Sequence, residues 1–162
     1  MKIKDGLEQW NETQRKARLK YANKLKGKPR NKIRRKKKGS LSYWKAKAIT
    51  EAKRVARSIG YCEKCYGTEN LQGSHIIAVG NSTLIAADVD NILCLCWHDH
   101  LGNGGWHLDP SANIDWFDAK WPGRRKMLQE RADMMRNAPT KPTAEDWHQK
   151  YLELLGMTRQ DG

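Results

Sequence analysis

Two short segments of the chain carry metal donors at spacings that suit one tetrahedral site. The first, residues 62–65, reads Cys-Glu-Lys-Cys and has the spacing of a zinc knuckle. Such a knuckle needs two further ligands from a distant part of the chain, and residues 94–100, which read Cys-Leu-Cys-Trp-His-Asp-His, can supply them. The sequence therefore predicts a structural zinc ion that joins these two segments.

The identity of the second pair of zinc ligands stays open on spacing alone. Cys96 and Asp99 repeat the three-residue step of the knuckle, whereas Cys94 and His98 are competing donors in the same run. A pair of buried thiols without metal is the alternative interpretation of the knuckle. The spacing favours the metal over free thiols, and the candidate zinc ligands are Cys62, Cys65, Cys96 and Asp99.

A single histidine, His75, stands in an apolar run that reads Gly-Ser-His-Ile-Ile. A neutral imidazole can take a proton near neutral pH, so this residue is a candidate general base. A lone histidine on an apolar strand is more often a hydrogen-bonded core residue. Here Asn91 and His100 accompany it in a strongly basic chain, which favours a catalytic role.

The charge of the chain is strongly positive and unevenly distributed. The net charge is +13, and the stretch from Lys2 to Lys38 holds 16 basic residues and three acidic ones. Such a density repels itself unless a polyanion neutralises it, which indicates nucleic acid or an acidic membrane. We find no apolar run that could span a bilayer and no signal-peptide core, so we expect DNA as the partner, no membrane, and a cytoplasmic location. The residues expected to contact DNA are Arg15, Arg18, Lys20, Arg30, Arg34, Arg35, Lys36, Lys37 and Lys38.

The length and hydrophobic content predict one modest core with appendages, in a mainly helical α+β fold. Apolar spacing predicts a basic helix over residues 6–26, followed by a flexible basic linker, so that residues 1–39 form a DNA-binding arm. A core helix over 40–60, capped by Ser40 or Ser42, should follow. The metal-binding segment would span 61–121, and C-terminal helices over 122–162 should pack on it.

Within these segments we expect a two-stranded ribbon from the apolar runs Leu71–Val79 and Leu84–Leu95, followed by an irregular loop. A short helix near 97–101 and a helix opened by Asp109-Pro110 come next. Two last helices are expected at Arg124–Arg136 and Thr143–Leu155, the second with a capping box.

The segment from about Tyr61 to His107 resembles the HNH, or His-Me finger, endonuclease superfamily. The shared pattern is Cys-x-x-Cys, then His-Ile-Ile, then Asp-Asn-x-Leu-Cys-Leu-Cys, a further His, and His-x-x-Pro at residues 107–110. Within the superfamily, this pattern is typical of a branch that is common among bacteriophage endonucleases, some of them similar to NinG-type recombination proteins. The resemblance implies that residues 61–121 form a ββα-metal finger, and that a phage-encoded protein would act in the host cytoplasm.

The resemblance also implies roles for individual residues. His75 would be the general base that deprotonates the attacking water, and Asn91 would brace the loop and help to orient it. His100 would bind the catalytic ion, Mg²⁺ or Mn²⁺. Many family members carry Asp before the base, where this chain has Ser74, and a fourth zinc cysteine where it has Asp99. Either His107 or Asp109 could supply a missing ligand, although His107 could equally pack beside Trp106.

Three functions follow as hypotheses. The first is a metal-dependent DNA endonuclease that cuts duplex DNA, nicking as a monomer and making paired cuts as a homodimer. The second is a nuclease of the same chemistry that acts on branched DNA in recombination. The third is a non-catalytic, zinc-stapled module that binds nucleic acid. Trp106 and Trp121 could stack on bases, and Arg124 and Arg125 could clamp phosphate or simply begin a solvated helix.

Overall fold

The computed structural model describes residues 36–78 and 84–157, together with Glu12, Arg15 and Lys16. The basic helix predicted over 6–26 and most of the linker lie outside the described residues. So do five of the residues expected to contact DNA: Arg18, Lys20, Arg30, Arg34 and Arg35. Of the remaining four, Arg15, Lys36, Lys37 and Lys38, every side chain is exposed.

The predicted core helix is α2, Leu41–Arg57. Ser40 caps it, since its side chain accepts a hydrogen bond from the Tyr43 N–H at 3.3 Å. Small side chains at positions 48, 52 and 56 line one fully buried face, which lets neighbouring elements approach closely. Leu41, at the start of the helix, is 44% exposed.

The sheet has two antiparallel strands, β1 (Leu71–His75) and β2 (Ile92–Cys96), with Leu71 opposite Cys96 and His75 opposite Ile92. The ribbon was predicted, but both strands are shorter than the apolar runs. The irregular segment also lies between the strands and not after them, as two 3₁₀ turns, η1 (Leu84–Ala87) and η2 (Val89–Asn91). The Asp88 carboxylate accepts the Asp90 N–H at 3.0 Å, and this local bond favours a turn over an extended strand.

Four helices follow the sheet where the sequence predicted helices. They are α3 (Trp97–Leu101), α4 (Pro110–Lys120), α5 (Arg124–Asn137) and α6 (Ala144–Leu155). Asp109 caps α4, and Thr143 with Asp146 forms the predicted capping box of α6. Before α5 the chain turns at Gly123, whose φ of +79° favours glycine. The α+β, mainly helical fold class is thereby confirmed for the described residues.

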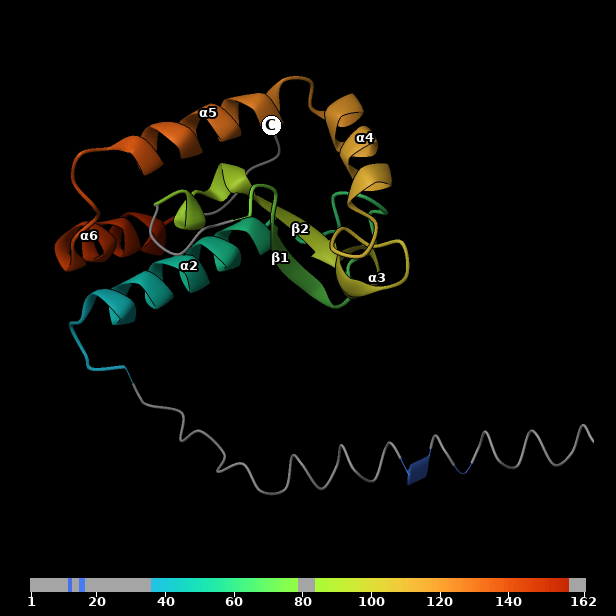
Figure 1. Ribbon diagram of the computed structural model, residues 1–162, viewed down its shortest axis with the longest axis horizontal. Coiled ribbons are helices and arrows are strands. Elements are labelled where there is room, and N and C mark those ends of the chain that lie inside the picture. Colours follow the sequence, from blue (N-terminus) through green and yellow to red (C-terminus); the bar gives the residue numbers. More distant parts are fainter. Residues whose placement is uncertain (1–11, 13–14, 17–35, 79–83, 158–162) are drawn as a thin grey trace, which may run out of the picture. The chain divides into compact units, whose positions relative to one another are not determined.

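Two buried clusters hold the elements together. In the first, α6 packs along α2 through Trp147 and Leu154, as Figure 1 shows for the two helices. In the second, β2 packs against α4 and α5 through Leu93, Phe117 and Leu128. No helix among the described residues is both long enough and apolar enough to cross a membrane.

Candidate metal centre and histidine site

Four side chains from the knuckle and from the β2–α3 corner meet at one point. Their donor atoms all lie within 4.8 Å of one another, and the residues are Cys62, Cys65, Cys96 and Asp99. The Sγ atoms of Cys65 and Cys96 are 3.7 Å apart, and Asp99 Oδ2 lies 3.2 Å from Cys62 Sγ. The predicted cluster of four donors is therefore close enough to bind a metal ion.

These separations fit the edges of a tetrahedron around zinc. With Zn–S of about 2.3 Å, two sulfur ligands stand roughly 3.8 Å apart, and a sulfur and an oxygen ligand roughly 3.5 Å apart. The two competing donors are not in the group found among the described residues: Cys94 is fully buried in β2, and the His98 side chain is 75% exposed. The geometry thus selects Cys96 and Asp99 as the second pair.

The knuckle is held to β2 by Glu63, a residue that the sequence analysis did not single out. The Glu63 N–H donates to the Cys94 carbonyl at 2.8 Å, and its carboxylate accepts the Cys94 N–H at 2.6 Å. The Cys62 N–H closes the knuckle turn on the Gly67 carbonyl at 2.7 Å. These hydrogen bonds hold the backbone of the knuckle in place, and with it the start of the Cys62 and Cys65 side chains.

The donor atoms of the cluster crowd one another electrostatically. The hydrogen bond with Asp99 is the largest cause that raises the pKa of the Cys65 thiol, to about 12. Burial raises the pKa of Cys96 as well. Burial alone would raise the pKa of Asp99, but hydrogen bonds from the thiols hold it below its usual value. A divalent cation that binds here would displace the protons of these thiols, because the thiolate is the form that binds the metal.

His75 ends β1 and is half-buried, with its Nε2 atom 2.9 Å from the carbonyl oxygen of Ala86. A carbonyl can only accept, so Nε2 carries the proton and the lone pair of the neutral ring is on Nδ1. Burial is the main cause that lowers the pKa of His75, and the charge of Lys53 lowers it further, against an opposing effect of the Ala86 bond. The imidazole is therefore neutral at pH 7, with Nδ1 able to take a proton.

Asn91 is fully buried and serves as a brace. Its Oδ1 accepts the Ile77 N–H at 2.8 Å, and its Nδ2 donates to the carbonyls of Ile77 and Ile85 at 3.2 and 3.1 Å. Ile85 directly precedes Ala86, whose carbonyl orients the His75 ring. The position of Asn91 agrees with the expected bracing role, and both of its amide hydrogens are already used.

His100 on α3 is held by a residue that the sequence did not single out. Its Nδ1 atom lies 2.6 Å from Gln72 Oε1, and its ring lies 4.8 Å from the ring of His107. With Nδ1 donating to the amide oxygen, Nε2 carries the lone pair and can bind an ion. Burial, followed by the neighbouring His107, lowers the pKa of His100 to about 4, so the ring stays neutral.

Lys53 also belongs to this site, although no motif in the sequence pointed to it. Its stem crosses β1 at Gly73, where an added Cβ would come within 2.8 Å of Lys53 Cγ. After burial, the charge of Lys53 is among the causes that lower the pKa of both His75 and His100. A glycine in the middle of a predicted strand was the available signal for a close approach of this kind.

The side chain of Ser74, the residue before His75, is turned away from solvent. It is 1% exposed, and its Oγ has no hydrogen-bond partner among the residues that the structure describes. Among the described residues, the cysteine and aspartate cluster is also the one group in which three or more such donor atoms gather. Within the described part of the chain, His75, His100 and His107 do not form a second closed set of metal ligands.

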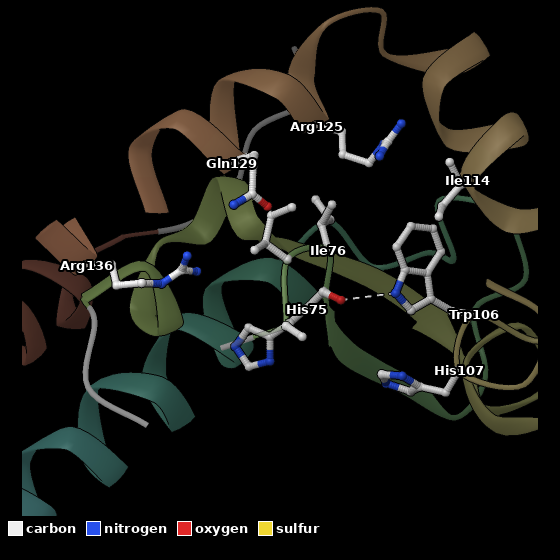
Figure 2. A pocket seen from close by; sticks show the side chains of 10 residues that line it. His75, Ile76, Trp106, His107, Ile114, Arg125, Gln129 and Arg136 are labelled. Atoms are coloured by element: carbon white, nitrogen blue, oxygen red, sulfur yellow. Dashed lines mark hydrogen bonds between the residues drawn. The ribbon is translucent and has the colours of Figure 1, made fainter. Parts of the chain in front are cut away.

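Four other residues that the sequence analysis considered for DNA or metal binding make contacts that hold the fold together. Arg125 binds both oxygens of Asp118 through Nε at 3.0 and 3.1 Å, and Arg124 donates to the Asp90 carbonyl at 2.6 Å. The Trp106 indole donates to the His75 carbonyl at 3.1 Å, which Figure 2 shows as a dashed line. Asp109 is engaged as the cap of α4.

Comparison of the chain with protein-family models, with curated proteins and with solved structures gave no match. Function is therefore inferred from the residues and their geometry alone.

Proposed function

We propose that this protein is a metal-dependent endonuclease that hydrolyses phosphodiester bonds of DNA, with His75 as its general base. The observation that carries the proposal is the bond between His75 Nε2 and the Ala86 carbonyl at 2.9 Å. This bond fixes the tautomer and leaves the Nδ1 lone pair for a water molecule. The exposed basic residues, among them Lys36, Lys37 and Lys38, suit a phosphate backbone.

In the proposed reaction, His75 Nδ1 takes the proton of a water molecule as the water oxygen attacks the phosphorus in line. The Ala86 carbonyl then stabilises the imidazolium that forms, because its oxygen already accepts the Nε2 proton. The Lys53 side chain packs on β1 at Gly73, two residues before His75, and its positive charge would attract the scissile phosphate. Asn91 holds the chain next to Ala86, so it is a positioning residue in this scheme.

A catalytic divalent ion, when bound, would stabilise the charge on the phosphate and on the leaving oxygen. His100 Nε2 is the donor best prepared to hold it, with His107 beside it. Imidazole donors suit Mn²⁺ better than Mg²⁺, which prefers oxygen ligands. We therefore expect stronger activity with Mn²⁺ than with Mg²⁺.

We further propose that Cys62, Cys65, Cys96 and Asp99 hold a structural zinc ion, for which their spacing is suitable. The ion would tie the knuckle to the N-terminus of α3. Because α3 carries His100, the zinc would also keep that ring at its place beside β1. The segment from the knuckle to α3 would then be a ββα-metal finger of the HNH type.

A second candidate is a zinc-stapled module that binds nucleic acid without cutting it. Two observations favour this alternative: Ser74 replaces the expected carboxylate, and its hydroxyl is buried. The proposed chemistry of the base does not depend on Ser74, however, because His75 is oriented by Ala86. We therefore place the nuclease first.

The deciding experiment is cleavage of supercoiled plasmid and of a four-way junction with Mn²⁺, Mg²⁺ or EDTA. Wild type is compared with His75→Ala and with His98→Ala, a control whose side chain is 75% exposed and outside the donor cluster. We expect metal-dependent cutting that the His75 variant loses and the control retains. Unchanged, salt-sensitive binding without cutting by wild type would support the binding module.

A further inference from the structure

A cavity of about 560 Å³ opens beside His75, between the end of β1, α4 and α5. Its apolar wall is formed by Ile76, Trp106 and Ile114, and Figure 2 shows these side chains around the pocket. The volume is in the range of sites that enclose small organic ligands. His75 and His107 line one part of the cavity, and the phosphate and water molecule of the mechanism proposed above would need only that part. The rest of the space has no role in that mechanism.

The opposite side of the cavity is polar and comes from α5. Arg125, Gln129 and Arg136 line it at spacings of four and seven residues, which place them along one face of that helix. Arg125 is steadied by Asp118, and Arg136 Nη1 by Asp133 at 2.8 Å. Gln129 Nε2 likewise donates to the Asp133 carboxylate at 3.0 and 3.1 Å. The polar side of the cavity is therefore made of guanidinium and amide groups, each paired with a carboxylate that lies outside the described lining.

The cavity is also linked to the base through Trp106. This indole is 7% exposed and packs edge-on against Phe117 at 5.8 Å, so its ring is fixed in place. Its N–H binds the backbone carbonyl of His75 at 3.1 Å. A group that contacts Trp106 from the cavity therefore lies directly beside the residue proposed to activate water.

We propose that this cavity takes the base of an unpaired nucleotide adjacent to the scissile phosphate. Apolar and aromatic walls suit the faces of a nucleobase, and Gln129 with the two arginines suits its polar edge and the flanking phosphates. A base inside a duplex is stacked and paired and cannot enter such a pocket unless it is extruded. The preferred substrate is therefore DNA with unpaired nucleotides, as in gaps, flaps and branches. This inference rests on the proposed nuclease function and names its substrate class.

The test measures binding in EDTA, where no cutting occurs, by fluorescence anisotropy of labelled oligonucleotides. A blunt duplex is compared with the same duplex carrying a three-nucleotide gap, at one fixed salt concentration so that phosphate contacts contribute similarly. Wild type should bind the gapped DNA about tenfold more tightly, as one base stacked in a pocket allows. Equal affinities for the two DNAs would overturn the inference.

Matched variants show whether the preference comes from the cavity. Gln129→Trp places a large ring at the mouth of the cavity, whereas Met134→Trp adds the same ring to the same helix at a side chain that is 69% exposed and outside the lining. The first variant should lose the preference for gapped DNA and the second should keep it. Retention of the preference in both would overturn the assignment to this cavity.

Failure of this inference can be told apart from failure of the proposed function. A preference for gapped DNA without metal-dependent cutting would support the role of the cavity and contradict the proposed nuclease activity. Metal-dependent cutting without the preference would support the nuclease activity and contradict the role of the cavity.

Discussion

Removal of the metal from the cysteine and aspartate cluster should destabilise the protein by an amount that follows from the chain topology. A metal that joins Cys65 to Cys96 closes a loop across 31 positions. Cross-links that close loops of this size stabilise a fold by roughly 3.5–4 kcal/mol, through the entropy of the unfolded chain. For a unit of this size, each 1 kcal/mol corresponds to about 4 °C, so stripping the metal should lower the melting temperature by about 15 °C.

The assay combines elemental analysis with thermal denaturation, with and without excess chelator. Purified wild type should carry about one zinc per chain and lose it with the predicted fall in melting temperature. Cys65→Ser is the informative variant, because this thiol is exposed and its replacement leaves no cavity. It should lack tightly bound zinc and show little further change with chelator.

The matched control is Cys94→Ala, which removes a buried thiol that is outside the donor cluster. Its melting temperature should fall because of the lost packing, but its zinc content and its response to chelator should match wild type. Wild-type protein without zinc, or a Cys65→Ser variant with normal zinc, would contradict the reasoning.

Three further predictions concern residues around the base. Ser74→Ala removes a buried hydroxyl without a partner, so it should raise the free energy of unfolding in urea by about 1 kcal/mol; a loss would contradict this. Asn91→Ala leaves the Ile77 N–H and the Ile77 carbonyl unpaired, while the Ile85 carbonyl still accepts the Asp88 N–H, so it should lower the same free energy by roughly 2–3 kcal/mol. A change below about 1 kcal/mol would show that the brace is unimportant. Because burial lowers the pKa of His75, the cleavage rate should be flat above pH 6.5 and fall only at lower pH, where the imidazole becomes protonated. A midpoint above 6.5 in the pH–rate profile would argue against His75 as the base.

Local sequence signals were sufficient to predict most of the helices and the residues that form the metal cluster. The Ser40 cap and the Thr143 capping box are interactions between residues three apart, so the sequence displays both partners. Cys96 and Asp99 repeat the three-residue step of the knuckle, and such spacing at a helix start brings two side chains to one point. The spacing alone did not exclude Cys94 and His98, which the fold places outside the group of donors.

Contacts between distant segments could not be predicted in this way. Gln72 binds His100 and Lys53 crosses Gly73 only because β1, α2 and α3 come together in the fold. Neither side chain differs in type from many others in the chain. The 3₁₀ turns between the strands were also missed, since the apolar run Leu84–Leu95 has the composition of a strand while its first part is held by side-chain bonds from Asp88 and Asn91.

The claim that His75 Nδ1 is the general base is tested most directly by the single-turnover cleavage rate of His75→Ala, measured with Mn²⁺ and increasing concentrations of free imidazole. We predict a loss of about 10²- to 10⁴-fold relative to wild type, with partial recovery as imidazole rises, because the free base can replace the missing ring. Cleavage by the variant at the wild-type rate without imidazole would contradict the account.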